Sequence, residues 1–241
     1  MSLKGSAVFV SDVHLSESEP QTIELFNQFL KAECIQHSAL FILGDLFDYW
    51  IGDDSPQFQY IRKLFNELSA TTDIYFVSGN RDFLVGKDFF KSSNITLLSD
   101  LTKIQMSGQE ALIMHGDTLC IDDTEYQKYR IQVHSNEWKN TFLKKSIKER
   151  LSICNDLRRN SEEAKKNKEE YIMDVNHDAV HDVFRDNGYP SLLIHGHTHR
   201  LNTHHYEFES HKCQRWVLGD WHKKGNCIVW NNNEMKFLYL G

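Results

Sequence analysis

Short apolar segments recur along the chain, and polar residues of chemical interest directly follow most of them. The segments with the length of buried strands are 7–10, 39–43, 74–78, 111–114 and 192–194. Apolar residues at helical spacing lie between the first three of these segments, at 22–31 and 58–70. The tail, 203–240, has short alternating apolar runs broken by glycine and asparagine, which predicts strands and hairpins. Strands that alternate with helices favour a partly parallel α/β sheet in the first half of the chain.

Five of the predicted strands end in Asp, His or Asn. The motifs are Asp12-Val13-His14, Gly44-Asp45, Gly79-Asn80-Arg81-Asp82, His115-Gly116-Asp117 and Gly196-His197-Thr198-His199. In an extended chain Asp12 and His14 face the same side, so both can reach one point in space. Because ligands bind beyond the carboxyl ends of strands in such sheets, we expect all five motifs to meet in one crevice.

Carboxylate oxygens beside imidazole nitrogens suit Mn²⁺, Fe²⁺ or Zn²⁺. The candidate ligands are Asp12, His14, Asp45, Asn80, His115, His197 and His199. A structural zinc site uses four protein ligands, so this larger set favours two metals with a bridging carboxylate. Two cations about 3.5–4 Å apart can hold a hydroxide between them and stabilise a phosphate undergoing displacement. Taken singly, each Asp or Asn is also typical of a turn or helix cap, and His115 of a buried, hydrogen-bonded histidine.

In their order, the five motifs resemble the calcineurin-like metallophosphoesterase superfamily, and the resemblance covers nearly the whole chain. It implies an α/β fold, a four-layer α-β-β-α sandwich, as one domain over 1–241 with a helical cap insertion at 124–170. It also implies that one metal is held by Asp12, His14, Asp45 and His199. The other metal would be held by Asp45, Asn80, His115 and His197, with Asp45 as the bridge.

Arg81 narrows the expected reaction. Protein phosphatases of the superfamily carry a histidine after the Asn, and that histidine resembles a general acid for an alkoxide leaving group. Arginine cannot donate a proton at useful pH, but its planar guanidinium binds phosphate oxygens. A phosphate monoester, with a second pKa near ~6, can leave without being protonated. The motif therefore predicts hydrolysis of a pyrophosphate bond, whereas the structural alternative for Arg81 is a surface salt bridge.

Four stretches resemble one branch of the superfamily, the enzymes that hydrolyse UDP-2,3-diacylglucosamine in lipid A biosynthesis. They are 42–54, 79–84, 115–123 and 173–176. The resemblance implies that a hydroxide between two Mn²⁺ ions attacks the α-phosphorus, giving UMP and 2,3-diacylglucosamine 1-phosphate (lipid X). Asn80 and Arg81 would be catalytic, with Arg81 stabilising the transition state. The substrate contacts it implies are Asn80, Arg81, Asp123, Ser161, Lys165, Lys168 and His197. Lys165 stands where some relatives carry Asn.

The net charge of -7 is unevenly distributed. The segment 128–168 contains 12 basic and 5 acidic residues, against 15 and 29 in the remainder. From Trp138 to Leu157 apolar residues recur near helical spacing among lysines and arginines, which predicts a helix with apolar and cationic sides. Such a helix can lie on an anionic membrane surface or cover acyl chains while its cations meet a diphosphate. The alternative is an ordinary surface helix.

The five cysteines are odd in number and contain no Cys-x-x-Cys, which favours a reducing compartment. The first predicted strand begins at residue 7 and no apolar run approaches ~20 residues, so we expect no signal peptide and no membrane span. We expect a monomer on the cytoplasmic face of the bacterial inner membrane, a lipid-linked UDP-sugar substrate and, from the acidic balance, no nucleic-acid partner.

Other functions stay open from the residues alone. They are a phosphodiesterase of the superfamily acting on cyclic nucleotides, soluble nucleotide-sugars or nucleic acid, and a non-catalytic scaffold that retains the fold. Several acidic residues also have two interpretations. Asp48, Asp53 and Asp54 either orient metal ligands or cap helices, and Asp123 either contacts substrate or caps the following helix.

Overall fold

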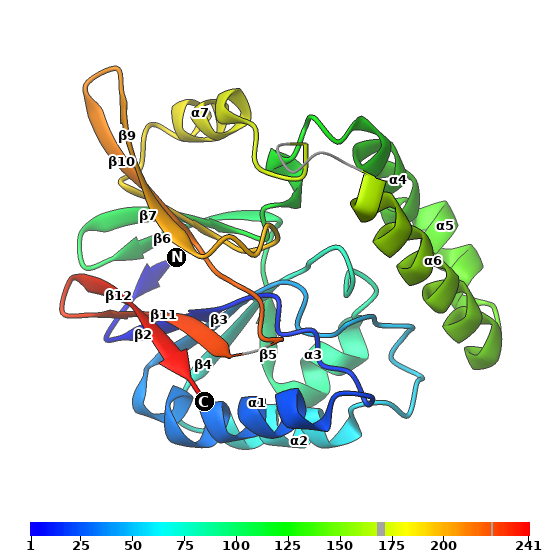
Figure 1. Cartoon of the computed structure of the whole chain (residues 1–241). Coiled ribbons are helices and arrows are strands. Elements are labelled where there is room, and N and C mark those ends of the chain that lie inside the picture. The colour runs from blue at the N-terminus through cyan, green and yellow to red at the C-terminus, as the bar shows by residue number, and fades with distance from the viewer. Residues whose placement is uncertain (168–171, 223) are drawn as a thin grey trace.

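The computed structural model of the protein describes residues 1–167, 172–222 and 224–241, with side chains in 160–167 left undescribed. Its strands form two mixed sheets packed face to face (Figure 1). One sheet has the order β12 (Glu234–Leu240), β11 (Gly225–Asn231), β2 (Ala7–Val10), β3 (Ala39–Leu43), β4 (Asp73–Val77), β5 (Ile95–Leu97). The other has the order β1 (Ser2–Leu3), β6 (Leu101–Met106), β7 (Gln109–Met114), β8 (Leu192–His195), β10 (His211–Val217), β9 (Asn202–Phe208).

Helices cover both outer faces of the paired sheets. The first sheet is covered by α1 (Pro20–Ala32), α2 (Gln59–Leu68) and α3 (Lys87–Ser93), at the bottom of Figure 1. The second is covered by α7 (His177–Asp186), and short 3₁₀ turns lie at Cys34–Gln36 and Asp117–Leu119. The predicted four-layer α-β-β-α sandwich is therefore confirmed. No helix in the described ranges is long and apolar enough to span a membrane.

Three layers of apolar side chains explain why the central strands are apolar on both faces. On β2, Val8 and Val10 face the helices, whereas Ala7 and Phe9 face the opposite sheet. Phe9 stacks on Phe41 of β3 at 4.9 Å between ring centroids, inside the layer between the sheets. A strand that is buried on both faces has a continuous run of apolar residues, and such runs were the basis for predicting these strands from the sequence.

The parallel pairing of β2, β3 and β4 determines where the site forms. Val10 lies opposite Ile42 in register, and Ile42 lies opposite Phe76, so the carboxyl ends of these strands meet at one edge. In the second sheet β7 and β8 are also parallel. All five polar motifs therefore leave the strands at the same end of the sandwich.

Several elements were not predicted. The helix α3 has only seven residues and the strand β5 only three. The strand β6 has few buried residues. The apolar pattern of all three elements is therefore weak. The predicted helix 22–31 begins two residues earlier, because Pro20 occupies the first turn, where its missing N–H costs nothing.

The basic segment forms three helices, α4 (Thr124–His134), α5 (Asn136–Leu143) and α6 (Ile147–Asn167), which stand together to one side of the sandwich (Figure 1). The single amphipathic helix expected from Trp138 onward is wrong, because the chain breaks at 144–146. Ser146 and Glu149 cause the break by forming a reciprocal capping box: the Glu149 carboxylate accepts from the Ser146 N–H at 2.9 Å, and the Ser146 hydroxyl accepts from the Glu149 N–H at 3.3 Å.

Arg150 attaches α6 to the body of the protein. Its buried guanidinium donates to both carboxylate oxygens of Asp54, at 2.7 and 2.5 Å, and to the carbonyl of Ile51. A two-pronged contact of this kind fixes orientation as well as distance. Asp54 therefore anchors a helix rather than a metal ligand. Asp53 caps α3 through the N–H groups of Asp88 and Phe89.

Candidate metal centre and adjoining cavity

Five of the seven candidate ligands adopt left-handed backbone conformations. The φ angles are 54° at Asp12, 52° at His14, 54° at Asp45, 67° at His197 and 57° at His199. Each such residue costs on the order of 1–3 kcal/mol, and this kind of strain concentrates at functional sites. Asp12 and His14 lie close together, as we expected. The chain is not extended at these residues, however, so the reason given for that expectation was wrong. Two left-handed residues bring them together.

Asp12, His14 and His199 form one group of possible metal ligands. Asp12 Oδ1 lies 3.3 Å from His199 Nε2 and 3.9 Å from His14 Nε2, and the two imidazole nitrogens are 3.4 Å apart. Asp12 is fully buried, and its Oδ1 atom has no hydrogen-bond partner in the described structure. A buried carboxylate oxygen that makes no hydrogen bond and faces two imidazoles fits a divalent cation.

A second group of possible ligands consists of Asp12, Asp45 and His115. His115 Nε2 lies 3.7 Å from Asp45 Oδ1. Asn80 completes this side, since its Oδ1 lies 2.9 Å from His115 Nε2 and 2.9 Å from His197 Nδ1. The structure therefore brings together all seven predicted ligands, from five strand ends. Asp12 belongs to both groups, and the bridging role of Asp45 stays a prediction.

Two glycines are required by the close approach of these loops. A Cβ atom at Gly79 would collide with Asp45 Oδ1, and one at Gly196 would collide with Asp12 Oδ2. Any larger residue at either position would therefore displace a carboxylate of the metal centre.

Residues behind the ligands hold them in orientation. His115 Nδ1 donates to the carbonyl of Leu43 at 2.9 Å, and His199 Nδ1 donates to Asp220 Oδ2 at 3.1 Å. Asp82 accepts from the N–H groups of Leu46 and Gly79, at 2.7 and 2.8 Å, and so joins the two loops that carry Asp45 and Asn80. Asp82 and Asp220 were not predicted as site residues. Asp220 carried a usable signal, because it follows a strand and a glycine as Asp45 does.

Burial and mutual charge shift the pKa values of the ligands. Burial alone would lower the pKa of His115, but the charges of Asp45 and Asp12 raise it to about 9. The pKa of His199 also rises to about 9, since the charge of Asp12 and the hydrogen bond to Asp220 outweigh burial. Burial, together with the charge of His115, lowers the pKa of His197 to about 3. In the metal-free protein the two raised histidines thus carry the protons at neutral pH.

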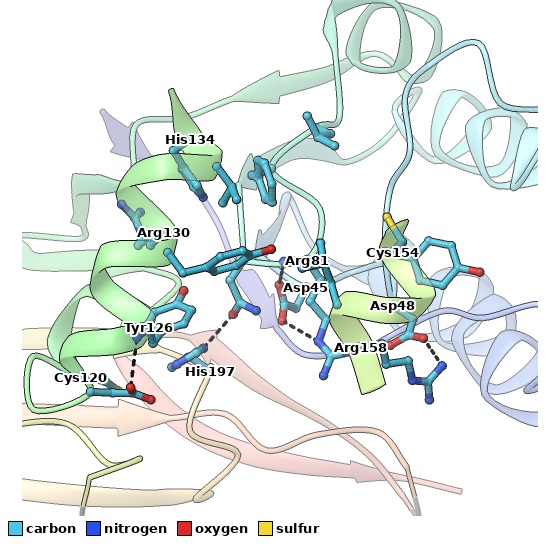
Figure 2. Close-up of a pocket in the computed structure, with 18 of the residues that line it drawn as sticks. Asp45, Asp48, Arg81, Cys120, Tyr126, Arg130, His134, Cys154, Arg158 and His197 are labelled. Atoms are coloured by element: carbon cyan, nitrogen blue, oxygen red, sulfur yellow. Dashed lines mark hydrogen bonds and ion pairs between the residues drawn. The ribbon is translucent and has the colours of Figure 1, made fainter. Parts of the chain in front are cut away.

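Arg81 lies at the border between the metal groups and the cavity. Its backbone N–H donates to Asp45 Oδ1 at 2.9 Å, and its guanidinium donates to Asp48 Oδ1 at 2.6 Å. Asp48 Oδ2 accepts from Arg158 of α6, also at 2.6 Å. Figure 2 shows Arg81 and Arg158 beside Asp45 and Asp48, with His197 and Tyr126 across the cavity. Arg158 was predicted only as one of many cations on the helix.

The cavity beside the metal groups has a volume of about 630 Å³. Its polar end includes Asp45, Asn80, Arg81 and His197. Apolar and aromatic side chains from α4, α5, α6 and the neighbouring loops line the rest, among them Trp50, Phe83, Leu84, Val133, Trp138, Phe142 and Leu157. One continuous space therefore offers a polar site for phosphate and an apolar wall.

The predicted substrate contacts divide into two sets. Asn80, Arg81, Asp123 and His197 line the cavity. Ser161, Lys165 and Lys168 lie outside the residues whose side chains the structure describes. Asp123 also caps α4 by accepting from the N–H of Tyr126 at 3.1 Å, so both interpretations of this residue agree with its geometry.

Comparison with known proteins identifies the family. Residues 6–201 match the calcineurin-like phosphoesterases. The chain belongs to this family. A protein of Aromatoleum aromaticum named UDP-2,3-diacylglucosamine hydrolase is 42% identical over 229 residues, covering 94% of this chain and 93% of that one. A Vibrio parahaemolyticus protein of the same name is 40% identical over 237 residues, covering 95% of each chain.

Membership of the calcineurin-like phosphoesterase family agrees with the convergence of five strand ends on two groups of possible metal ligands. The chain is accordingly a hydrolase. The matched range includes all seven candidate ligands, from Asp12 to His199. Asp220 lies beyond it.

Proposed function

We propose that the protein hydrolyses the pyrophosphate bond of UDP-2,3-diacylglucosamine, releasing UMP and 2,3-diacylglucosamine 1-phosphate. The observation that carries this proposal is the continuity of the cavity, because one space joins Arg81 and four candidate metal ligands to an apolar wall; the four are Asp45, Asn80, His197 and His199. A diphosphate with acyl chains at one end needs both surfaces at once. A soluble nucleotide-sugar or cyclic nucleotide would leave the aromatic wall exposed to water.

Two divalent cations, which we propose to be Mn²⁺, would supply positive charge to the reacting phosphate and would lower the pKa of the attacking water. The residues that would hold them are Asp12, His14, Asp45, Asn80, His115, His197 and His199. We propose that Asp45 bridges the two positions, since it is buried between His115 and the backbone N–H of Arg81.

Arg81 is proposed to stabilise charge on the phosphate as the bond to the leaving group breaks. Asp48 orients its guanidinium at 2.6 Å, while the Arg81 side chain remains 26% exposed and so can contact a ligand in the cavity. The leaving group is a phosphate monoester and departs as an anion, so a cation suffices and no proton donor is needed at this position. Asn80 precedes Arg81 in the chain, and its side-chain oxygen contacts both His115 and His197. These two contacts fix the turn that carries Arg81.

Helices α4, α5 and α6 are proposed to form a cap, with bounds 124–170, that covers the acyl chains. Their inward side chains, Val133, Trp138, Phe142 and Leu157, line the cavity. On the same helices Ile131 is 73% exposed and Leu143 is 40% exposed, and the sequence of α5 and α6 is rich in lysine. Such a surface suits peripheral attachment of a monomer to the anionic cytoplasmic face of a bacterial inner membrane.

The reaction is tested by phosphorus NMR of the Mn²⁺-loaded protein with UDP-2,3-diacylglucosamine in ¹⁸O-water. Label in UMP is expected, because attack at the α-phosphorus places the new oxygen there. Label in the sugar phosphate would show that water attacks the other phosphorus atom and that UMP is the leaving group. Turnover of a generic phosphodiester, with none of this substrate, would refute the proposed substrate and retain the family.

A matched pair of substrates tests the role of the apolar wall. UDP-N-acetylglucosamine carries the same diphosphate without the long acyl chains. We expect kcat/KM to fall by several orders of magnitude for this compound, and equal values for the two substrates would contradict the proposed lipid specificity.

A further inference from the structure

Asp220 contacts one candidate metal ligand from the side opposite the metal groups. Its Oδ2 atom lies 3.1 Å from Nδ1 of His199. A carboxylate can only accept here, so Nδ1 carries a hydrogen in either protonation state, and Nε2 is the nitrogen that presents a lone pair once the ring is neutral. That Nε2 atom lies 3.3 Å from Asp12 Oδ1 and 3.4 Å from His14 Nε2.

The loop that carries Asp220 is held firmly on both sides. Asn226 of β11, which is buried, accepts from the Gly219 N–H at 3.0 Å and donates to the Asp220 carbonyl at 2.9 Å. Trp221 is buried and packs edge-on against Phe26 and Phe29 of α1. The carboxylate is therefore fixed before any metal arrives.

The other histidines of the centre have different partners on their outer nitrogens. His115 Nδ1 donates to a neutral carbonyl, that of Leu43. His14 Nδ1 is buried and has no partner among the described residues. A carboxylate partner makes an imidazole a stronger metal ligand than a carbonyl does, and loss of such a partner typically lowers metal affinity about 10–100-fold. The two proposed metal positions therefore differ in the hydrogen-bond partners of their histidines, and within the described structure only the position that includes His199 has a carboxylate partner.

We propose that Asp220 is a positioning residue for His199 and selectively strengthens metal binding at the position formed by Asp12, His14 and His199. The position that includes His115 does not depend on it. This inference rests on the proposed function only in requiring that both positions bind a divalent metal.

The test is a titration of the metal-free, full-length protein with Mn²⁺. Binding is measured in two ways, by isothermal titration calorimetry and by the EPR signal of the Mn²⁺ that stays free. The wild type is expected to bind two ions. Asp220→Asn keeps the shape of the side chain and the backbone contacts of the loop. We expect this variant to bind one of the two ions with an affinity lowered about 10-fold or more, and to bind the other with unchanged affinity. Asp182→Asn, at an exposed aspartate on α7, is the matched control and should change neither affinity.

A second comparison assigns the affected position. In a His115→Ala background, Asp220→Asn should weaken the remaining ion, whereas in a His14→Ala background it should have no further effect. Equal affinities in Asp220→Asn and the wild type, or an equal loss at both positions, would overturn the inference while leaving the proposed function intact. A wild-type protein that binds no Mn²⁺ would instead refute the two-metal proposal itself.

Discussion

Arg158 on α6 and Asp48 beside the metal centre form an ion pair, with 2.6 Å between Arg158 Nη1 and Asp48 Oδ2. The other oxygen of the same buried carboxylate accepts from Arg81 at the same distance. Asp48 thus joins a helix of the basic segment to the turn that carries the proposed catalytic arginine. The two guanidiniums approach each other only because one carboxylate lies between them, since two cations would otherwise repel.

Asp48→Asn should impair catalysis without removing metals. The amide keeps the shape of the side chain but not the charge that orients Arg81, and small displacements of a positioning group can cost up to about 10²-fold in rate. We expect kcat/KM to fall about 10-fold or more, measured by steady-state kinetics, with metal content unchanged. Asp182→Asn serves as the control, and a wild-type kcat/KM in Asp48→Asn would show that the pairing has no part in the reaction.

Arg81→Ala should lower kcat by about 10²-fold or more, as removal of other transition-state donors does. Metal content should stay the same, because the 2.9 Å hydrogen bond to Asp45 Oδ1 is made by the backbone N–H of residue 81, and the side chain adds only a longer ion pair, 3.7 Å from Nε to Asp45 Oδ2. Arg81→Lys tests the geometry, since it keeps the charge but loses the planar fork. If kcat were unchanged in Arg81→Ala, the residue would have only a structural role.

Asp45→Ala should remove both metals together with activity, if Asp45 is the bridge. Plasma emission spectroscopy of the purified variant gives the metal stoichiometry, and Asp12→Ala is the informative comparison because Asp12 belongs to both groups of ligands. Retention of one ion in Asp45→Ala, with loss of both in Asp12→Ala, would assign the bridge to Asp12 instead.

Metal binding should release protons at neutral pH. In the metal-free protein the pKa values of His115 and His199 are about 9, above the ordinary value near 6.5. Their protonation therefore stabilises the metal-free fold fully below about pH 6.5, and this contribution is lost as the pH rises through about 9. A metal requires the deprotonated imidazole, so Mn²⁺ affinity should increase with pH up to about 9.

Calorimetric titrations in two buffers of different ionisation enthalpy measure that release. We expect about two protons released per protein at pH 7 and about half a proton at pH 9.5. A heat of binding independent of the buffer at pH 7 would show that both histidines are already neutral.

The sequence by itself determined the fold class and predicted the set of candidate ligands. Strands buried on both faces give continuous apolar runs, and the parallel order brings their ends to one edge, so Asp45 and Asn80 could be assigned to one site without coordinates. The apolar side of the basic segment was also readable, because Trp138 and Phe142 recur at helical spacing.

Only the tertiary structure determined the contacts between segments distant in the chain. The pairing of Arg158 with Asp48 spans 110 residues, and His199 reaches Asp220 through a loop fixed by Asn226. The break between α5 and α6 depends on a capping box within a stretch of continuous helical pattern. Periodicity along a chain reports which face of an element is buried, but the partner of a charged side chain depends on the packing of whole elements, and no local pattern encodes it.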